Sequence, residues 1–177
     1  LTNSKQLSNE LFHAEMRHLN TDSDSEVLLN IFAHELAKQR EIYPSAENFF
    51  KAVKKTHIRC DGAYAVIALI TGHGILAFRD NNGIRPLSIG IREGKSVDEY
   101  IIASEDALFM SLGYTKLRDI EPGEAVFIDK KGNLHSQQCS DSPQKRPCIF
   151  EYVYFSRPDS KIDEISVYKA RMRMGSK

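Results

Sequence analysis

The chain has 177 residues, enough for one domain or for one domain and a piece of another, and its 41% hydrophobic content is sufficient for a core. Lysine plus arginine and aspartate plus glutamate both total 24, so no net charge attracts nucleic acid or an anionic membrane surface. The odd number of cysteines, 3, argues against a secreted disulfide framework. No apolar run approaches the roughly 20 residues that cross a bilayer. We therefore expect a cytoplasmic protein.

Three helices are predicted in the first part of the chain. Thr2 or Asn3 can cap a short first helix. Ser23, with Glu26 three residues later, is typical of a capping box at the start of a second helix. The apolar stripe at helical spacing that follows comprises Val27, Leu28, Ile31, Phe32 and Leu36. Ser45 opens a third helix. Its inward-facing residues are expected to be Phe49, Phe50 and Val53.

Beyond these helices the apolar period changes to that of strands. The expected strands cover residues 63–70, 75–79, 86–91, 99–103 and 125–128, with a further hairpin arm after 131–133. Glu105 to Leu112 is predicted to be a brief helix that ends at Gly113. Helices first and an antiparallel meander afterwards indicate an α+β layered domain rather than a doubly wound parallel sheet.

The segment from Glu151 to Ser160 has an unusual composition, because three aromatic residues in four positions are followed by Arg157, Pro158 and Asp159. We expect a rigid apolar strand that ends in a charged corner, as in a seam between domains or the wall of a pocket. Helical spacing of apolar residues then continues at Ile165, Tyr168 and Met172. Since the chain lacks an initiator Met and stops soon after these residues, we expect it to be a segment of a longer protein.

Asp24 is the first candidate binding residue. It lies in the first turn of the second predicted helix, where free N–H groups and the helix dipole favour a carboxylate, so simple capping is one explanation. The start of this helix nevertheless has more hydrogen-bond acceptors than it needs, namely Asp22, Ser23, Asp24 and Glu26. One carboxylate is then left to bind a cation such as an ammonium group, and both interpretations stay open.

Other reactive or charged residues have simpler interpretations. Cys60 precedes a predicted buried strand and has no histidine placed as an obvious base, so a small buried thiol is favoured over a nucleophile. The six histidines have no metal-ligand spacing, so no metal site is predicted. The charges of Arg79, Asp80 and Arg85 around the turn at 82–83 are interpreted as a solvated ion-pair corner.

The chain carries several further motifs, namely Asn20 to Glu26, Gly62 to Ala65, Phe78 to Leu87, Ala103 to Glu105, Pro122 to Ala125 and Glu151 to Ser160. Together these motifs resemble the amidophosphoribosyltransferase family of glutamine-dependent enzymes. They occur in order over essentially the whole chain. The first helix-start motif is shared with sugar-phosphate aminotransferases of the glucosamine-fructose-6-phosphate type, whereas the motifs at 82–87 and 154–160 point to the phosphoribosyl branch.

The resemblance implies the four-layer αββα fold of N-terminal-nucleophile hydrolases, with antiparallel sheets and incomplete at both ends. Residues 1–150 are then the C-terminal part of the domain that releases ammonia from glutamine. Residues 151–177 are the seam between domains and the start of a domain that joins ammonia to phosphoribosylpyrophosphate, giving 5-phosphoribosylamine in the first step of de novo purine synthesis. The implied partners are glutamine and phosphoribosylpyrophosphate, and the full-length protein is expected to be a homo-oligomer.

The resemblance also implies roles for particular residues. The family's nucleophilic N-terminal cysteine and oxyanion-hole Asn-Gly pair lie upstream of Leu1, so we expect no catalytic residue in this segment and no activity from it alone. Asp24 matches the aspartate that holds the α-amino group of glutamine. Tyr154 matches a position near the ammonia passage between the two sites, and a core aromatic is an equal alternative. Arg157 is expected at the same domain interface, where it shapes the charged corner.

The implied cofactors lie outside this segment. Mg²⁺ is expected with phosphoribosylpyrophosphate in the full-length enzyme. Cys148 falls where some family members supply one iron–sulfur ligand, but a single cysteine cannot hold a cluster, so none is predicted here. Two alternatives stay open, namely the glutaminase domain of a sugar-phosphate aminotransferase and a non-catalytic scaffold or regulatory protein that has lost the cysteine.

Overall fold

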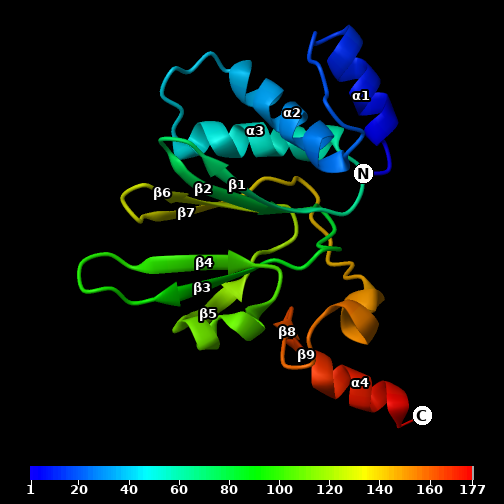
Figure 1. The fold of residues 1–177 in the computed structure, drawn as a ribbon, viewed down its shortest axis with the longest axis vertical. Helices are drawn as coiled ribbons and strands as arrows, with labels where there is room; N and C mark the ends of the chain where they lie inside the picture. Colours follow the sequence, from blue (N-terminus) through cyan, green and yellow to red (C-terminus); the bar gives the residue numbers. More distant parts are fainter. Residues whose placement is uncertain (177) are drawn as a thin grey trace.

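Three helices form the first layer of the fold. The structure, a computed structural model, describes residues 1–176. Its first helices are α1 (Ser4–His13), α2 (Asp24–Ala37) and α3 (Ala46–Arg59), which lie together on one side of the molecule (Figure 1). All three predicted helices are therefore confirmed.

The starts of α3 and α2 are stabilised by different contacts. At α3, the Ser45 hydroxyl and the Asn48 side chain form a capping box, in which the Asn48 amide oxygen accepts the Ser45 N–H at 2.9 Å. The box predicted at Ser23 and Glu26 is wrong. The Glu26 carboxylate instead accepts the backbone N–H groups of residues 20–21 at 2.8 Å each, which lowers the pKa of Glu26 to about 2. Glu26 thus orders the loop before α2.

A four-stranded antiparallel sheet lies beneath the helices. Its strands are β1 (Ala65–Ile70), β2 (Gly74–Arg79), β6 (Glu124–Asp129) and β7 (Leu134–Gln138), in the order β1-β2-β6-β7. β1 and β2 form the predicted hairpin. At Gly74 a Cβ would fall 2.0 Å from the carbonyl oxygen of Ile128, so the close pairing of β2 with β6 requires glycine.

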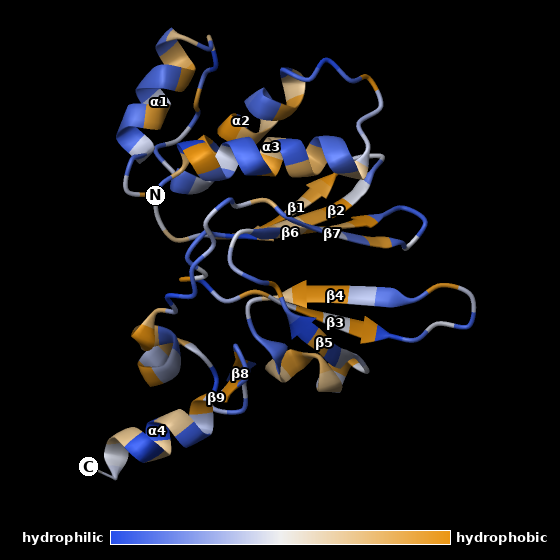
Figure 2. Cartoon of the chain, turned by 180° about the vertical axis from the view of Figure 1, so that it is seen from behind, coloured by the Kyte–Doolittle hydropathy of each residue, from blue (hydrophilic) through white to orange (hydrophobic). Residues whose placement is uncertain are grey.

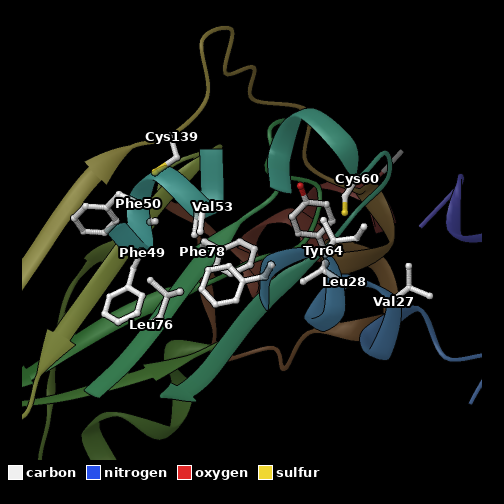
Figure 3. Packing of buried hydrophobic residues seen from close by; sticks show 14 of the residues in the cluster. Val27, Leu28, Phe49, Phe50, Val53, Cys60, Tyr64, Leu76, Phe78 and Cys139 are labelled. Carbon is white, nitrogen blue, oxygen red and sulfur yellow. The ribbon is translucent and has the colours of Figure 1, made fainter. Parts of the chain in front are cut away.

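The residues of β2 alternate between the two faces of this sheet, as the pleat of a strand requires. Leu76 and Phe78 face the helices, where Phe49 and Val53 of α3 pack into the same cluster (Figure 3). Ala77 belongs to a second cluster on the opposite face. Burial of each large apolar side chain contributes about 1.5–3 kcal/mol, so the predicted stripes of α2 and α3 hold the helical layer on the sheet.

A second, three-stranded antiparallel sheet lies below the first. Its strands are β3 (Ser88–Arg92), β4 (Glu99–Ala103) and β5 (Thr115–Asp119), in the order β4-β3-β5. Figure 2 shows hydrophobic residues in the strands of both sheets. The buried residues between the sheets are Ala77, Leu87, Ile89, Ile120 and Val126. They join the two sheets into one sandwich.

The sequence predicted this second half less well. β5 was not expected, because its sequence, Thr-Lys-Leu-Arg-Asp, has a single apolar residue and three charges. The helix expected at 105–112 consists of two 3₁₀ turns, η1 (Asp106–Leu108) and η2 (Met110–Leu112). The chain leaves them at Gly113, as predicted, with a left-handed φ of +78°.

The layer order is helices, sheet, sheet and short helical turns. This confirms the α+β class and the αββα arrangement with antiparallel sheets, and η1 and η2 stand in the fourth layer within residues 1–176. None of the helices in this described part combines the length and the apolar character that crossing a membrane requires.

Residues 151–176, called the C-terminal segment below, contain a small apolar cluster of their own, Tyr152, Ile162 and Val167. The segment contains η3 (Glu151–Phe155), β8 (Lys161–Ile162), β9 (Ile165–Ser166) and α4 (Val167–Gly175). The strand predicted at 151–160 is wrong, because η3 is a π-helix. Ser156 donates its N–H to the Glu151 carbonyl at 3.0 Å, and Arg171 of α4 donates to the carbonyls of Tyr152 and Ser156 at 2.7 Å. The predicted C-terminal helix is confirmed as α4.

Candidate functional site

A cleft of about 670 Å³ opens beside the first sheet. It is lined by the first turns of α2, by residues 63–69 along β1, by Arg85 and Pro86 in the loop after β2, and by Leu1. β1 is the edge strand of its sheet in the described structure, so consecutive residues of this strand reach the cleft. The cleft therefore combines an apolar wall with a few charged groups at its margin.

Asp24 is the first residue of α2, and its carboxylate lies at this cleft. The helix start is capped by its neighbour, because the Ser23 hydroxyl accepts the N–H of Ser25 at 3.3 Å. The Asp24 carboxylate instead accepts a hydrogen bond from the N-terminal ammonium of Leu1. That bond, together with one from the Ser4 hydroxyl, holds the pKa of Asp24 below its usual value. Asp24 is thus not used as a cap, and its partner is an ammonium group.

Leu1 is held beside Asp24 by the turn at the end of α3. The N–H of Thr2 donates to the carbonyl of Asp61 at 2.8 Å. Gly62 has a φ of +132°, and a Cβ there would lie 3.1 Å from the Cα of Leu1, so glycine permits the close approach. In a chain with a residue before Leu1, this nitrogen is an uncharged peptide N–H, and the ammonium group of a ligand can take its place at Asp24.

The loop between β2 and β3, residues 80–87, forms another wall of the cleft. The buried carboxylate of Asp80 accepts the backbone N–H groups of Asn82, Ile84 and Arg85 at 2.9, 3.1 and 3.1 Å. The expected solvated ion-pair corner is wrong, because Arg79 and Asp80 are 1% and 0% exposed. The loop is therefore fixed from within by a carboxylate that bonds to three of its N–H groups.

The residues expected at the domain interface lie outside the cleft lining. Tyr154 is 78% exposed, so it is not a core aromatic within the described structure. Arg157 forms an exposed ion pair with Asp159 at 2.9 Å. The residue pair that joins the cleft wall to the C-terminal segment is instead Arg85 and Glu151, at 2.5 Å. The sequence singled out both segments, Phe78 to Leu87 as a motif of the family and Glu151 to Ser160 also by its composition, but it carried no signal that these two residues meet.

Two of the thiols, those of Cys60 and Cys139, are buried and unreactive. Cys60 lies in the core beneath α2, 3% exposed, and burial raises its pKa to about 11 (Figure 3). Burial likewise raises the pKa of Cys139 to about 12. The interpretation of Cys60 as a structural thiol is confirmed.

One cluster of possible metal ligands lies away from the cleft. Glu15, His34 and Glu35 have donor atoms within 4.8 Å of one another. Arg59 lies among them and donates to Glu15 at 2.8 Å and to Glu35 at 2.7 Å. Because the Arg59 guanidinium already pairs with both carboxylates, the cluster acts as an ion-pair network that joins α2 and α3.

The sequence comparison defines the class of protein first. Residues 1–111 match a family described as a glutamine amidotransferase domain, and the chain therefore belongs to this family. Within it, the chain is similar to the amidophosphoribosyltransferases of Pseudomonas aeruginosa, Escherichia coli and Saccharomyces cerevisiae, with 55%, 52% and 46% identity over 100% of its length. It spans 35%, 35% and 36% of those relatives, about a third of each.

Solved structures that resemble this chain are enzymes of the same kind. The chain superimposes on the glutamine phosphoribosylpyrophosphate amidotransferase from B. subtilis, complexed with ADP and GMP, with a TM-score of 0.80 and 35% identity. A second structure, titled as the allosteric regulatory enzyme of purine biosynthesis, also gives a TM-score of 0.80 at 35% identity. These matches cover 99% of this chain and 35% and 34% of the known ones.

Proposed function

We propose that this chain is the glutaminase part of an amidophosphoribosyltransferase. In the full-length protein, ammonia released from glutamine at the cleft is transferred to phosphoribosylpyrophosphate, giving 5-phosphoribosylamine. The similarity to such enzymes over the full chain supports this proposal, and the relatives named above favour it over a sugar-phosphate aminotransferase.

The observation that carries the proposal is the Asp24 carboxylate at the edge of the cleft, which the start of α2 does not use as a cap. The free amino acid glutamine has one α-ammonium group, and a carboxylate that is not needed for capping can bind it by a charge-assisted hydrogen bond. The apolar wall formed by β1 suits the methylene groups of the glutamine side chain. Asp24 is therefore assigned to substrate binding.

Hydrolysis also requires a nucleophile. Within residues 1–176 the cleft lining contains no cysteine, and the nearby Cys60 is buried with a raised pKa. As the resemblance implies, we place the nucleophilic cysteine before Leu1. Its thiolate attacks the side-chain amide carbon, ammonia leaves, and water then hydrolyses the thioester to glutamate.

The C-terminal segment is assigned to the start of the phosphoribosyltransferase domain. Its separate apolar cluster supports a boundary near residue 150, and the exposed aromatic side chains of η3 support a covering domain beyond residue 176. Tyr154 is assigned to the surface along which ammonia passes, because an apolar lining favours neutral ammonia. We also propose that Mg²⁺ binds together with phosphoribosylpyrophosphate. The full-length protein is assigned a cytoplasmic location and a homo-oligomeric state.

The test is the Asp24→Asn variant of the full-length protein. Loss of a charge-assisted hydrogen bond worth about 1.5–3 kcal/mol should raise the KM for glutamine by about 10- to 150-fold. Ammonia-dependent synthesis of phosphoribosylamine should be retained, since it does not use this site. Asp22→Asn is the matched control, because Asp22 is an exposed neighbour outside the cleft lining. Equal loss of the glutamine- and ammonia-dependent reactions would mean that Asp24 has a structural role.

A further inference from the structure

Asn82 and Gly83 form the one Asn-Gly pair of the sequence, and they lie in loop 80–87, which walls the cleft. In such a pair the backbone nitrogen after the asparagine attacks its side chain readily, because glycine has no Cβ that hinders the approach. The fold requires glycine here, since Gly83 has a φ of +58° and a Cβ would lie 2.7 Å from Cγ of Pro122. The cleft wall therefore contains a chemically reactive pair.

The peptide group between Asn82 and Gly83 is held at both of its polar atoms. The N–H of Gly83 donates to the carbonyl of Asp80 at 3.0 Å, and the carbonyl of Asn82 accepts the N–H of Arg146 at 2.7 Å. Attack on the asparagine side chain requires that the Gly83 nitrogen lose its proton and that this peptide group rotate. Both hydrogen bonds must break first, so the closed loop is unreactive.

The carboxylate of Asp80 holds the residues on either side of Gly83. Its Oδ1 accepts the N–H groups of Asn82 at 2.9 Å and of Ile84 at 3.1 Å, and Arg79 donates to the carbonyl of Gly83 at 2.8 Å. Asp80 is 0% exposed, so its buried charge depends on these N–H groups. The loop therefore opens as a unit, and its open form is a small fraction of the molecules.

We propose that Asn82 is a modification site that converts to isoaspartate, and that Asp80 limits the rate by keeping loop 80–87 closed. In the open loop the deprotonated nitrogen of Gly83 bonds to Cγ of Asn82. The Cγ–Nδ2 bond breaks, and ammonia leaves with a proton taken from water. Water then opens the resulting five-membered imide at either carbonyl, which gives aspartate or isoaspartate. Water is the only co-reactant.

Isoaspartate at position 82 disrupts the cleft wall. It adds one methylene group to the backbone and places a new carboxylate near the buried carboxylate of Asp80, and two like charges in one site oppose each other. Arg85 and Pro86, which line the cleft, follow in the same loop and are displaced with it. The resulting loss of glutamine turnover rests on the proposed function, whereas the reaction of Asn82 does not.

Mass spectrometry of the full-length protein, incubated at mildly alkaline pH, tests the reaction itself. Isoaspartate at residue 82 is followed in the native protein, in urea below the unfolding transition and in fully unfolding urea. Each backbone bond shifts an equilibrium by about fivefold and three must break, so the native rate should be about 100-fold below the unfolded one. The rate should rise steadily with urea. Equal native and unfolded rates, or no isoaspartate in the unfolded protein, would overturn the proposal.

Asp80→Asn tests the carboxylate, because the amide is uncharged and holds the loop less tightly. In the folded variant, modification of Asn82 should be about tenfold faster than in wild type. Asp129→Asn is the matched control, since the Asp129 carboxylate accepts the N–H groups of Lys131 and Asn133 at 2.8 and 3.0 Å in a different turn. It should leave the rate at Asn82 unchanged. Equal rates in the two folded variants contradict the role of Asp80, and the urea series on wild type decides if Asp80→Asn does not fold.

Asn133 is an internal control in every sample. It also lies in a turn held by a carboxylate, but the residue after it is Leu134, whose side chain hinders attack by the backbone nitrogen. Asn133 should therefore remain unmodified while Asn82 reacts. Modification of both residues at the same rate would show that the Asn-Gly pair has no special reactivity here and would overturn the proposal.

Glutamate release from glutamine, measured during the same incubation, tests the consequence for the cleft. Activity of the wild type should fall in step with isoaspartate at residue 82. Asn82→Ser cannot form the imide, so it should keep its initial activity throughout. Loss at the same rate in both proteins would overturn this consequence. A wild type that never releases glutamate would refute the proposed function, while the mass measurement still decides whether Asn82 is modified.

Discussion

Replacing Asp163 with asparagine tests how strongly the buried ion pair with Arg79 holds the C-terminal segment. The side chains of Arg79 and Asp163 are 1% and 2% exposed, and the carboxylate also accepts the ammonium of Lys145 at 3.1 Å. Residue 163 has a left-handed φ of +48°, which asparagine tolerates as well as aspartate does. The substitution therefore removes the charge with little change to the backbone.

We expect Asp163→Asn to lower the free energy of unfolding by about 3 kcal/mol. Removing one partner of a buried ion pair costs about 3–5 kcal/mol, and the asparagine oxygen still accepts one bond from the guanidinium, which places the loss at the lower end.

Urea unfolding of the full-length protein at a series of pH values measures this loss. Burial alone would raise the pKa of Asp163, but the bonds from Arg79 and Lys145 more than offset it and hold the pKa below its usual value. A lowered carboxyl pKa stabilises the folded state above the pKa of the unfolded chain, and this stability is lost as the pH falls through the folded pKa. The difference between wild type and Asp163→Asn should therefore be constant near neutral pH and shrink below about pH 4.

Asp159→Asn is the control from the same segment. Asp159 also pairs with an arginine, Arg157, but both side chains are 57% exposed, so its loss should not change the stability measurably. A loss of less than about 1 kcal/mol for Asp163→Asn, or equal losses in the two variants, would refute the assignment of Arg79 as a buried cation that depends on Asp163.

Three further predictions concern other parts of the chain. Glu164 has a φ of +67° in the tight turn between β8 and β9, where glycine is preferred, so Glu164→Gly should raise the free energy of unfolding by about 1 kcal/mol in urea denaturation. Acetylating the amine of Leu1 removes its charge, so an NMR titration should show the pKa of Asp24 rising towards its usual value of 3.8, and an unchanged pKa would contradict the ion pair. Burial lowers the pKa of His57 to about 4, so its imidazole binds a proton more tightly in the unfolded chain than in the folded one. The free energy of unfolding should therefore fall as the pH drops from about 6.5 to 4. In denaturation at several pH values, His57→Gln should flatten that dependence.

The sequence predicted the helical layer and most strands because their signals are local. The apolar stripe of α2, the Ser45 start of α3 and the alternation in β2 depend on neighbours a few residues away. β5 was missed because its charged side chains bond to residues outside the strand. Arg118 donates to Glu124 at 2.7 Å, and Lys116 donates to the carbonyl of Lys161 at 2.7 Å. A strand held in this way has no apolar pattern.

The site was predicted less completely because its contacts join distant parts of the chain. Asp24 was identified from its resemblance and from the surplus of acceptors around it. Arg79 was interpreted as exposed because its partner Asp163 lies 84 residues further on. Glu151 was placed in a strand because the π-helix depends on partners from Arg85 and α4. In each case the deciding contact is charged and long-range, and composition does not reveal it.

In the 177-residue piece, the free ammonium group of Leu1 competes with any amino acid that binds at Asp24. A tethered group reaches an effective concentration of about the millimolar range, and a free ligand must exceed it to take its place. Titrations of glutamine or its analogues into the 177-residue chain with a free terminus therefore understate the intrinsic affinity of the cleft. A version with a blocked or extended terminus reports the affinity itself.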